Sequence, residues 1–429
     1  MNDRLIFTTR RGFLSGSLTF VSAAATAPLF LGQTTRALAA AEGATRRRDD
    51  SQRILVVIQL AGGNDGLNTV IPYGDEQYYK LRPRLAIPTD QVIALRDGIG
   101  LHPAAVGLKE LYDEGRLAIV QGVGYPNPNR SHFTSTEVWH TADPELRRHE
   151  GWIGRYFDAC CKGADPGPEP IEGVALTSEA PLAMQGERFR PLAFEDPSAL
   201  AWKAPRRGDA AEAAFRKLHS DNASSDDEND ALARYLRRSA LEAVAGADEI
   251  RAAAGVELAS ARGRRGLLGG KGSLGESLSL VARMIRADLP TRVYYVSMGG
   301  FDTHTGQEFR HRRLMEEFGN AMNGFVAALS EDKLLDRVLV LCFSEFGRRV
   351  QENASGGTDH GEAAPMFLVG GAVRPGLHEK HPSLANLHRG DLPFACDFRR
   401  VYATVLRDWL KVNPRDVVGS HSSMSLLRA

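Results

Sequence analysis

Runs of apolar residues alternate with polar, glycine-containing loops along most of the chain after residue 53. The first run, "ILVVIQL" at 54–60, is unbroken, which is typical of a strand buried on both faces of a parallel sheet. The same form recurs in "RLAIVQGVG", "RVYYVSM" and "RVLVLCF", and "APMFLVGGAV" predicts a further buried strand. Each of the first four runs leads into a loop rich in Asp, Asn, Ser, His, Glu or Arg.

Helical periodicity separates these strands. In "HPAAVGLKELYDEG" and "RRLMEEFGNAMNGFVAALSEDK" the apolar residues recur near i, i+3, i+4 and i+7. Strand, loop and helix in alternation predict an α/β fold around a mostly parallel sheet with right-handed crossovers. Such folds bind ligands at the carboxyl ends of their strands, where the polar loops of this chain fall.

The N-terminal segment predicts export. "TTRRGFLSGSLTFVSAAATAPLFLGQTTRALAA" joins the Arg10–Arg11 pair to a weakly apolar stretch and small residues, which is the twin-arginine pattern. The apolar stretch is shorter than the ~20 residues of a membrane span, so no transmembrane helix is expected in the mature protein. We therefore expect a twin-arginine signal at 1–39 that is read by the twin-arginine export machinery, and a periplasmic or extracellular protein. The alternative is a surface helix that happens to hold two arginines.

The remaining boundaries follow from shifts in composition. Residues 40–53 are polar and predict a linker. Residues 202–273 contain the acidic stretch "DNASSDDEND" and an Ala- and Arg-rich helical pattern, which predicts a helical insertion or cap; a solvated hairpin with no role in chemistry is the alternative. The α/β domain is then expected at 54–201 and 274–429.

The balance of charge along the chain argues against a nucleic-acid partner. Among 429 residues, 53 Lys and Arg stand against 53 Asp and Glu, so the chain lacks the basic excess that nucleic-acid binding needs. No nucleic-acid partner is expected.

Candidate metal ligands lie in the polar loops. In "GGFDTHTG", Asp302 and His304 are two positions apart, so in extended backbone both point the same way and form a chelate for Zn²⁺ or Mn²⁺. The alternative is a turn with an exposed His. Similar loops add Asp65 in "GGNDGLNT", Glu345 in "FSEFGRR", and Asp359 and His360 in "GGTDHG". Because adjacent residues diverge, one of Asp359 and His360 is expected to bind and the other to support it.

A nucleophile and two arginines complete the candidate site. Ser131 lies where the loop "YPNPNRS" gives way to a helical segment, and a hydroxyl beside a helix N-terminus and a cation can act as a nucleophile. Its alternative role is to cap that helix. Arg130 and Arg348 are candidates to bind an anionic group, although Arg348 could instead form a salt bridge.

The ordered motifs "QLAGGNDGLNTVIP", "NRSHFTSTEVWHTA", "GGFDTH", "FSEFGR" and "GTDHG" resemble the exported bacterial DUF1501 family over essentially the whole mature chain. That family is similar, more distantly, to the alkaline phosphatase and sulfatase superfamily. The resemblance implies an alkaline-phosphatase-like three-layer sandwich that holds one or two divalent ions (Zn²⁺, Mn²⁺, Mg²⁺ or Ca²⁺). It also implies a Ser131 nucleophile, Asp65 and Glu345 on one ion, and Asp302, His304 and His360 on the other.

One position departs from the superfamily pattern. Phe346 stands where the superfamily has a histidine, and Phe cannot bind a metal, which leaves the second ion and hydrolysis open. Two functions therefore remain. The first is a metal-dependent hydrolase of small-molecule or polymeric phosphate or sulfate esters. The second is a non-catalytic periplasmic or cell-surface binding or assembly protein that keeps the fold.

Overall fold

The computed structural model describes residues 53–160, 170–200, 246–255 and 272–428. The chain divides into two units, residues 48–199 with 252–429 and residues 1–47 with 200–251. The elements that carry the argument below belong to the first unit. The predicted signal at 1–39 and nearly all of the linker at 40–53 lie outside the described residues. Of the predicted insertion at 202–273, only 246–255 and 272–273 are described, and 246–254 are helical.

A nine-stranded sheet forms the centre of the first unit, in the order β11-β5-β10-β9-β1-β8-β6-β7 with β12 beside β5. All neighbouring pairs are parallel except the two that β10 makes with β9 and β5. The strands are β1 (Ile54–Leu60), β5 (Leu117–Gly124), β6 (Gly173–Leu176), β7 (Leu192–Ala193), β8 (Val293–Met298), β9 (Val338–Phe343), β10 (Ala364–Gly370), β11 (Gly376–His378) and β12 (Cys396–Asp397). A small antiparallel sheet, β2-β4-β3, comprises β2 (Val70–Ile71), β3 (Ile93–Arg96) and β4 (Ile99–Leu101).

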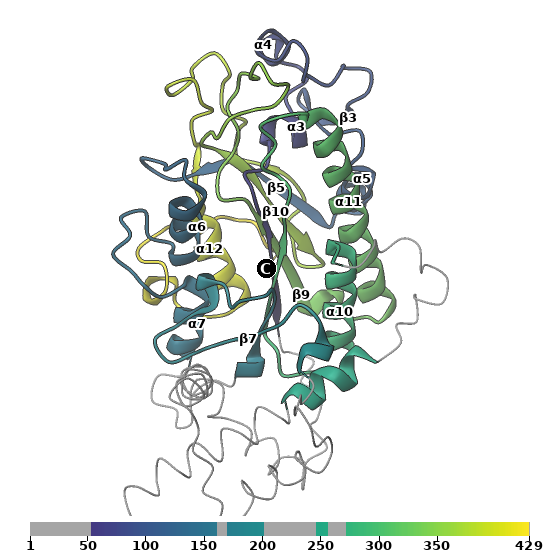
Figure 1. Ribbon diagram of the computed structural model, residues 1–429, viewed down its shortest axis with the longest axis vertical. Helices are drawn as coiled ribbons and strands as arrows, with labels where there is room; N and C mark the ends of the chain where they lie inside the picture. The colour runs from purple at the N-terminus through teal and green to yellow at the C-terminus, as the bar shows by residue number, and fades with distance from the viewer. Residues whose placement is uncertain (1–52, 161–169, 201–245, 256–271, 429) are drawn as a thin grey trace, which may run out of the picture. The chain divides into compact units, whose positions relative to one another are not determined.

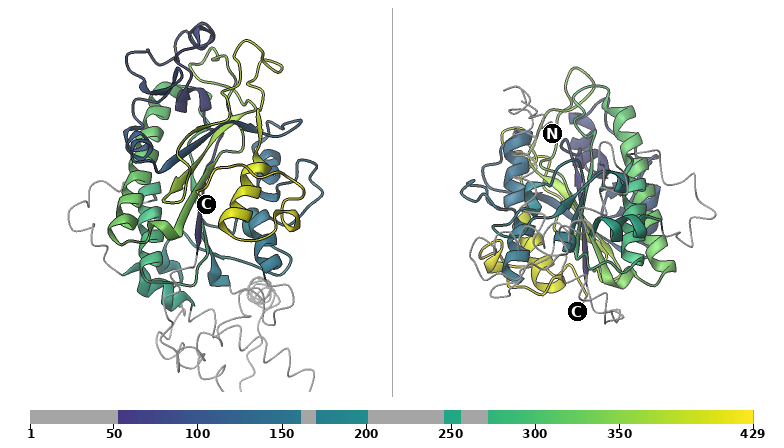
Figure 2. Two further views of the ribbon diagram at one scale, coloured as in Figure 1. Left: turned by 180° about the vertical axis from the view of Figure 1, so that it is seen from behind. Right: turned by 60° about the horizontal axis from the view of Figure 1, so that its bottom comes forward.

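Helices cover both faces of the large sheet, so the unit has three layers (Figures 1 and 2). One face carries α5 (Val106–Asp113), α10 (Leu274–Arg286) and α11 (Gln307–Glu331), and the other carries α6 (His132–Thr141), α7 (Trp152–Cys160) and α12 (Phe398–Thr404). The short helices are α3 (Gly66–Thr69), α4 (Glu76–Leu81), η1 (Pro170–Glu172), η2 (Leu182–Met184), η3 (Pro197–Leu200), η5 (Leu335–Arg337), η6 (Val405–Trp409, a π-helix) and η7 (Pro414–Asp416).

The core explains why the strands read as unbroken apolar runs. All residues of β1, β5, β9 and β10 are buried, because helices cover them on both sides. On the α6 and α12 side, the ring of Trp139 stacks on Phe398 with centroids 4.3 Å apart, and Trp152 stacks on Tyr402 at 4.4 Å. Such aromatic pairs bury large apolar areas and fix the helices against the sheet.

The α/β fold with a mostly parallel sheet is therefore confirmed, as are the five buried strands and the helices expected near 102–115 and 312–333. The antiparallel direction of β10 was not predicted, since an apolar run carries no information on strand direction. None of the described helices combines the length and the apolarity that crossing a membrane requires. The carboxyl ends of β5, β9, β1 and β8 meet at one edge of the sheet, where β10 begins.

A buried histidine under the sheet makes the fold sensitive to acid. On α6, His140 Nε2 lies 2.9 Å from the hydroxyl of Tyr295 and 3.3 Å from Gln59 Oε1. Burial lowers the pKa of His140 from 6.5 to about 4. Because its folded-state pKa lies below the unfolded value, the unfolded chain binds the proton first, and stability falls as the pH drops from 6.5 towards 4.

We predict that the His140→Gln variant loses less stability than the wild type as the pH falls from 6.5 to 4. The wild-type free energy of unfolding should fall by about 3 kcal/mol more than that of the variant between pH 6.5 and pH 4. Urea titrations at each pH measure the difference. His149→Gln, at an exposed position, is the control and should follow the wild-type curve. Parallel curves for the wild type and His140→Gln would contradict the prediction.

Candidate metal centre

The polar loops predicted from the sequence converge at one edge of the sheet. The loops after β1, β8 and β9, the loop between β5 and α6, and the loop that leads into β10 all meet there. Two glycines permit the close approach. A Cβ at Gly62, whose φ is 116°, would collide with the backbone nitrogen of Asp302, and a Cβ at Gly357 would collide with the carbonyl of His304.

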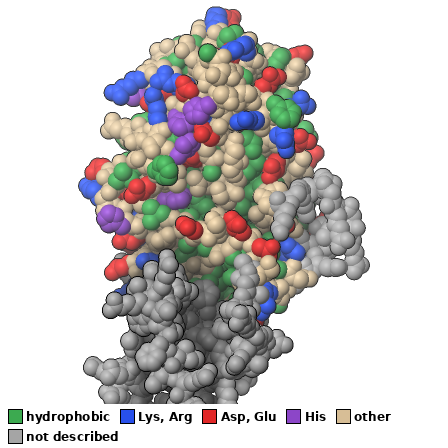
Figure 3. Space-filling view, in the orientation of Figure 1, with side chains coloured by type: hydrophobic (Ala, Val, Ile, Leu, Met, Phe, Trp, Pro, Cys, Tyr) green, Lys and Arg blue, Asp and Glu red, His purple; other side chains and the backbone are tan. Residues whose placement is uncertain are grey.

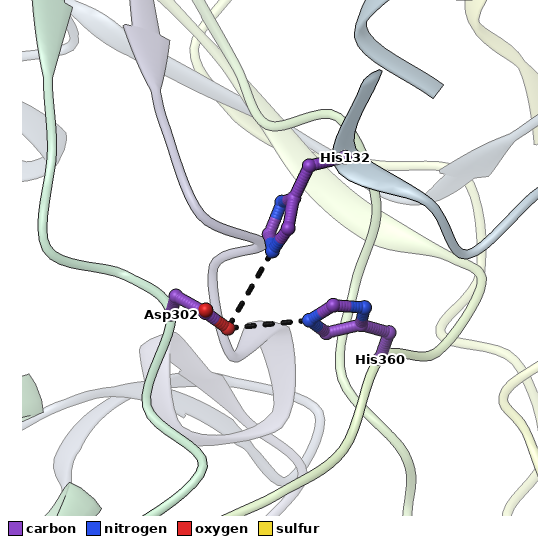
Figure 4. A group of neighbouring side chains, drawn as sticks. All are labelled: His132, Asp302 and His360. Carbon is purple, nitrogen blue, oxygen red and sulfur yellow. Dashed lines mark hydrogen bonds and ion pairs between the residues drawn. The ribbon is translucent and has the colours of Figure 1, made fainter. Parts of the chain in front are cut away.

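One oxygen atom is the centre of this cluster. Asp302 Oδ1 lies 3.1 Å from His304 Nε2, 3.2 Å from His360 Nε2 and 3.6 Å from His132 Nε2. Figure 4 shows His132 and His360 pointing at Asp302 from two different segments. The candidate ligand atoms of His132, Asp302 and His360 all lie within 4.8 Å of one another, a spacing that one metal ion can bridge. The Nε2 atoms of His304 and His360 are 2.9 Å apart.

The opposite nitrogen of each ring is already committed. A carboxylate or carbonyl oxygen only accepts hydrogen bonds, so each Nδ1 that contacts one must carry the proton. The three contacts are His132 Nδ1 to Glu345 Oε1 at 2.9 Å, His304 Nδ1 to Asp359 Oδ1 at 3.2 Å, and His360 Nδ1 to the carbonyl of Arg130 at 2.7 Å.

These contacts determine which nitrogen of each neutral ring faces the centre without a proton. With Nδ1 protonated, each neutral imidazole directs an Nε2 lone pair towards Asp302 Oδ1, which is itself an acceptor. His132 Nε2 is shielded from solvent and has no hydrogen-bond partner among the residues that the structure describes. Lone pairs that face one another repel unless a proton or a metal cation lies between them. Three nitrogens and one carboxylate oxygen are ligands that Zn²⁺ accepts, and an oxygen partner on the far nitrogen is the usual support of a metal-binding histidine.

The local charges favour a cation as well. The hydrogen bond to Glu345 raises the pKa of His132, against the opposing effect of burial. Burial raises the pKa of Asp302, but the hydrogen bond and the positive charge of Arg348 oppose this effect, and the pKa falls to about 2. Burial lowers the pKa of His360. The carboxylate is therefore ionised and His360 is neutral at neutral pH, which is the state that a metal ion requires.

Arg348 holds the loops that carry the centre. Its side chain is fully buried and donates to the carbonyls of Gly63 at 2.7 Å, Thr358 at 2.8 Å and Phe301 at 3.0 Å, and to that of Gly62. It also donates to Asp302 Oδ1 at 2.7 Å. A guanidinium with these five bonds joins the loops after β1 and β8 to the loop before β10.

Phe346 packs against the histidines. Its ring centroid lies 4.9 Å from that of His132 and 4.5 Å from that of His360. Phe346 is buried, so its ring supports two of the imidazoles without offering a ligand atom.

With this geometry in place, the comparison with protein families is informative. The family model DUF1501, described as a protein of unknown function, matches residues 52–387. The chain belongs to the DUF1501 family. A search among curated proteins found no significant relative.

Several solved structures are similar to this DUF1501 chain at low identity. They include the lipoteichoic acid synthase LtaP from Listeria monocytogenes, at 8% identity with a TM-score of 0.37, covering 89% of this chain and 77% of that one. The PsFucS1 sulfatase from Pseudoalteromonas sp. has 9% identity and a TM-score of 0.38, covering 87% and 73%. The alkaline phosphatase from the Antarctic bacterium TAB5 has 9% identity and a TM-score of 0.30, covering 75% and 92%.

Asp65 lies in a separate, buried network of the DUF1501 chain. Its Oδ2 is 2.6 Å from Arg82 Nη1 and its Oδ1 is 2.9 Å from Arg82 Nη2, with both side chains fully buried. Gln307 also donates to Asp65 Oδ2. The remaining donors of Arg82 reach Asn68 Oδ1 and the carbonyls of Arg349 and Val350. Both oxygens of Asp65 are therefore taken by a guanidinium.

The predicted nucleophile and the second arginine lie beside the centre. Ser131 is exposed, precedes His132 and occupies the cap position of α6, but its hydroxyl makes no capping hydrogen bond. The guanidinium of Arg130 pairs with Asp391 and lies 3.8 Å from Glu362, while its carbonyl binds His360. Arg130 is thus tied to a neighbouring acidic pair.

The structure accordingly brings Asp302, His304 and His360 together, with Glu345 and Asp359 bound to the far side of two rings. From the sequence, His132 could orient Ser131, bind a metal or stack in the core, and in the structure its Nε2 lies 3.6 Å from Asp302 Oδ1. It directly follows Ser131 and lies 170 positions before Asp302 in the chain. The sequence signal that pointed to His132 as a site residue was its position at the start of a helix that follows a buried strand.

The buried ion pair of Asp65 provides a test of how the loops are held. We predict that Arg82→Met lowers the free energy of unfolding by about 3–5 kcal/mol, because it leaves Asp65 buried without a positive charge to balance its own. Adding Asp65→Asn to that variant should restore part of the loss. The control, Arg84→Met, removes the half-exposed guanidinium that pairs with Glu352 and should cost less than about 1 kcal/mol. Urea unfolding measures all three, and equal losses for Arg82→Met and Arg84→Met would contradict the prediction.

Proposed function

We propose that this protein is an exported metal-dependent hydrolase of phosphate or sulfate esters that uses Ser131 as its nucleophile. The observation that carries the proposal is the convergence of three imidazole Nε2 atoms on Asp302 Oδ1, with each Nδ1 bonded to an oxygen. No structural role within the fold requires that arrangement, whereas a divalent cation satisfies all four atoms at once.

The proposed ligands are His132, Asp302 and His360, with His304 as a fourth. Glu345 and Asp359 are assigned to the far nitrogens of the rings, where they orient the imidazoles. Zn²⁺ and Mn²⁺ suit this nitrogen-rich set better than Mg²⁺ or Ca²⁺, which prefer oxygen ligands. Asp65 is left out because Arg82 occupies both of its oxygens, so we propose one ion per chain.

Ser131 is proposed to carry the transferred group. A bound cation supplies positive charge that lowers the pKa of a nearby hydroxyl and stabilises the anionic ester. Ser131 Oγ, after losing its proton to solvent, forms a bond to the phosphorus or sulfur atom while the bond to the leaving alcohol oxygen breaks. The alcohol takes a proton from solvent. Water then attacks the same phosphorus or sulfur atom, which releases Ser131 and inorganic phosphate or sulfate.

A second candidate function, a non-catalytic binding or assembly protein, is supported by one observation. Arg130 and Arg348, the arginines expected to bind a substrate anion, are both engaged by protein groups. An anion would then depend on the cation and on the N-terminus of α6 for its binding.

The metal prediction separates ligands from their supports. The purified chain should bind one Zn²⁺ or Mn²⁺, and His132→Ala, Asp302→Asn and His360→Ala should each weaken binding more than 100-fold. Glu345→Gln and Asp359→Asn should weaken it by about 10- to 100-fold, since they act through a ring nitrogen. Elemental analysis and competition with a chelating dye measure both effects. His149→Ala is the control, and ligand variants that retain the ion would overturn the assignment.

The activity prediction concerns Ser131. Ser131→Ala should lower kcat toward aryl phosphates or aryl sulfates by at least about 10³-fold while one metal ion remains bound, because Ser131 is a nucleophile and not a proposed ligand. Thr136→Ala, on the same helix, is the matched control and should retain activity. A fully metal-loaded wild type that hydrolyses neither ester with any of the four ions would favour the binding or assembly function.

A further inference from the structure

The first two turns of α11 carry an exposed group of positive charges. Arg310, Arg312 and Arg313 are exposed on this helix, and Phe309 beside them is 67% exposed. The guanidinium of Arg313 lies over the ring of Phe309, 5.9 Å from its centroid. Across the described part of the chain, none of the three arginines forms an ion pair. We call Phe309, Arg310, Arg312 and Arg313 the arginine patch.

The position of these arginines at the helix start is unfavourable in two respects, although Glu308 and Glu316 each lie four residues from Arg312. The N-terminus of a helix carries a partial positive charge, so cations in the first turns are repelled by it. Arg310 and Arg313 are also three residues apart, a spacing at which like charges repel each other. Only Glu308 offers a negative charge in the first turn. A bound polyanion would offset both repulsions.

The opposite face of the same helix turn is fixed in the protein. Gln307 and His311 are buried, and the side chain of Gln307 bonds to Asp65, Thr303 and Thr358. The patch is therefore held by a rigid helix whose inner side is anchored in the loops of the metal centre.

The patch also lies close to that centre along the chain. Asp302 and His304 belong to the loop that leads directly into α11, which begins at Gln307. With a rise of about 1.5 Å per residue, the arginines lie within roughly 10 Å of the helix start, measured along its axis. Figure 3 shows histidine side chains gathered high on one face of the molecule, with Lys and Arg side chains beside them.

We infer that the arginine patch binds anionic groups of the substrate beyond the one that reacts, so that the substrate is a polysaccharide with several sulfate or phosphate groups. This inference rests on the proposed hydrolysis at the metal centre. Guanidinium groups bind such oxyanions through two parallel hydrogen bonds. The ring of Phe309 offers a flat apolar surface to a sugar.

Other polyanions fit the patch less well. Insertion into a membrane surface requires a row of large apolar side chains, and Phe309 is the single one in the patch. Nucleic acid usually engages more phosphates than three arginines can neutralise, and the chain as a whole has a net charge of zero.

The test measures binding separately from catalysis. Heparin serves as the polyanionic polysaccharide, and its affinity for the chelator-treated full chain is measured by calorimetry over a series of NaCl concentrations. The triple variant Arg310→Gln, Arg312→Gln, Arg313→Gln should raise the Kd at least tenfold. It should also reduce the slope of log Kd against log salt by about two to three, since each neutralised charge contributes about 0.7–0.9. The triple Lys variant, which keeps the charges, should retain most of the affinity and the slope.

The control variant removes three exposed arginines elsewhere, Arg96→Gln, Arg147→Gln and Arg407→Gln, and should bind heparin like the wild type. With sulfated oligosaccharide substrates, the patch variant should raise KM tenfold and leave kcat unchanged. With aryl esters, it should change neither value.

Unchanged heparin binding in the patch variant overturns the inference, as does an equal loss in the control. Binding to anionic lipid vesicles that is stronger than binding to heparin also overturns it. Lost heparin binding in a chain that hydrolyses no ester supports the patch and overturns the proposed hydrolysis alone.

Discussion

The repulsion among acceptor atoms around Asp302 Oδ1 is the constraint on which the rest of the centre depends. Each of the three neighbouring imidazoles has its Nδ1 proton bonded to an oxygen, so each neutral ring turns a lone pair towards the carboxylate. Asp302 is half exposed, but His132 Nε2 is shielded from solvent, so this arrangement is unfavourable unless a positive charge lies between the atoms. Protons can supply that charge one at a time, whereas a divalent ion satisfies all of the atoms together. The oxygen partners on the far nitrogens therefore fit the proposal that Nε2 is the binding atom.

Keeping these rings in place requires loops that are far apart in the sequence to stay fixed. The sheet brings the ends of its central strands to one edge, and Arg348 then ties three loops together through four backbone carbonyls and Asp302. Glu345 makes the second connection, because its Oε1 accepts from the backbone nitrogen of Gly62 at 2.7 Å as well as from His132. Both charged residues act on position and orientation, which is what a preorganised site needs before it binds an ion.

The sequence predicted the strands and the loops that would meet, because unbroken apolar runs followed by polar, glycine-rich segments depend only on local pattern. It also identified Asp302, His304 and His360 as candidate site residues. The distinction between a ligand and its support could not be predicted, since it depends on which atom of a ring faces inward. Glu345 was expected as a ligand, and Asp359 as either a ligand or the support of His360; in the structure their oxygens bond the far nitrogens of His132 and His304. Asp65 also could not be resolved, because its partner Arg82 lies in an unremarkable polar stretch 17 positions later.

The position of Arg82 bears on how many ions the centre can hold. All five of its N–H groups have oxygen partners, and two of them saturate the carboxylate of Asp65. A metal ion that took Asp65 as a ligand would have to displace this bidentate pair, in which Arg82 holds both carboxylate oxygens. The phenyl ring of Phe346 acts in the same direction, since it packs beside His132 and His360 and offers no ligand atom. A fixed guanidinium thus supplies positive charge at Asp65, and the group around Asp302 is left as the proposed ligand set for a cation.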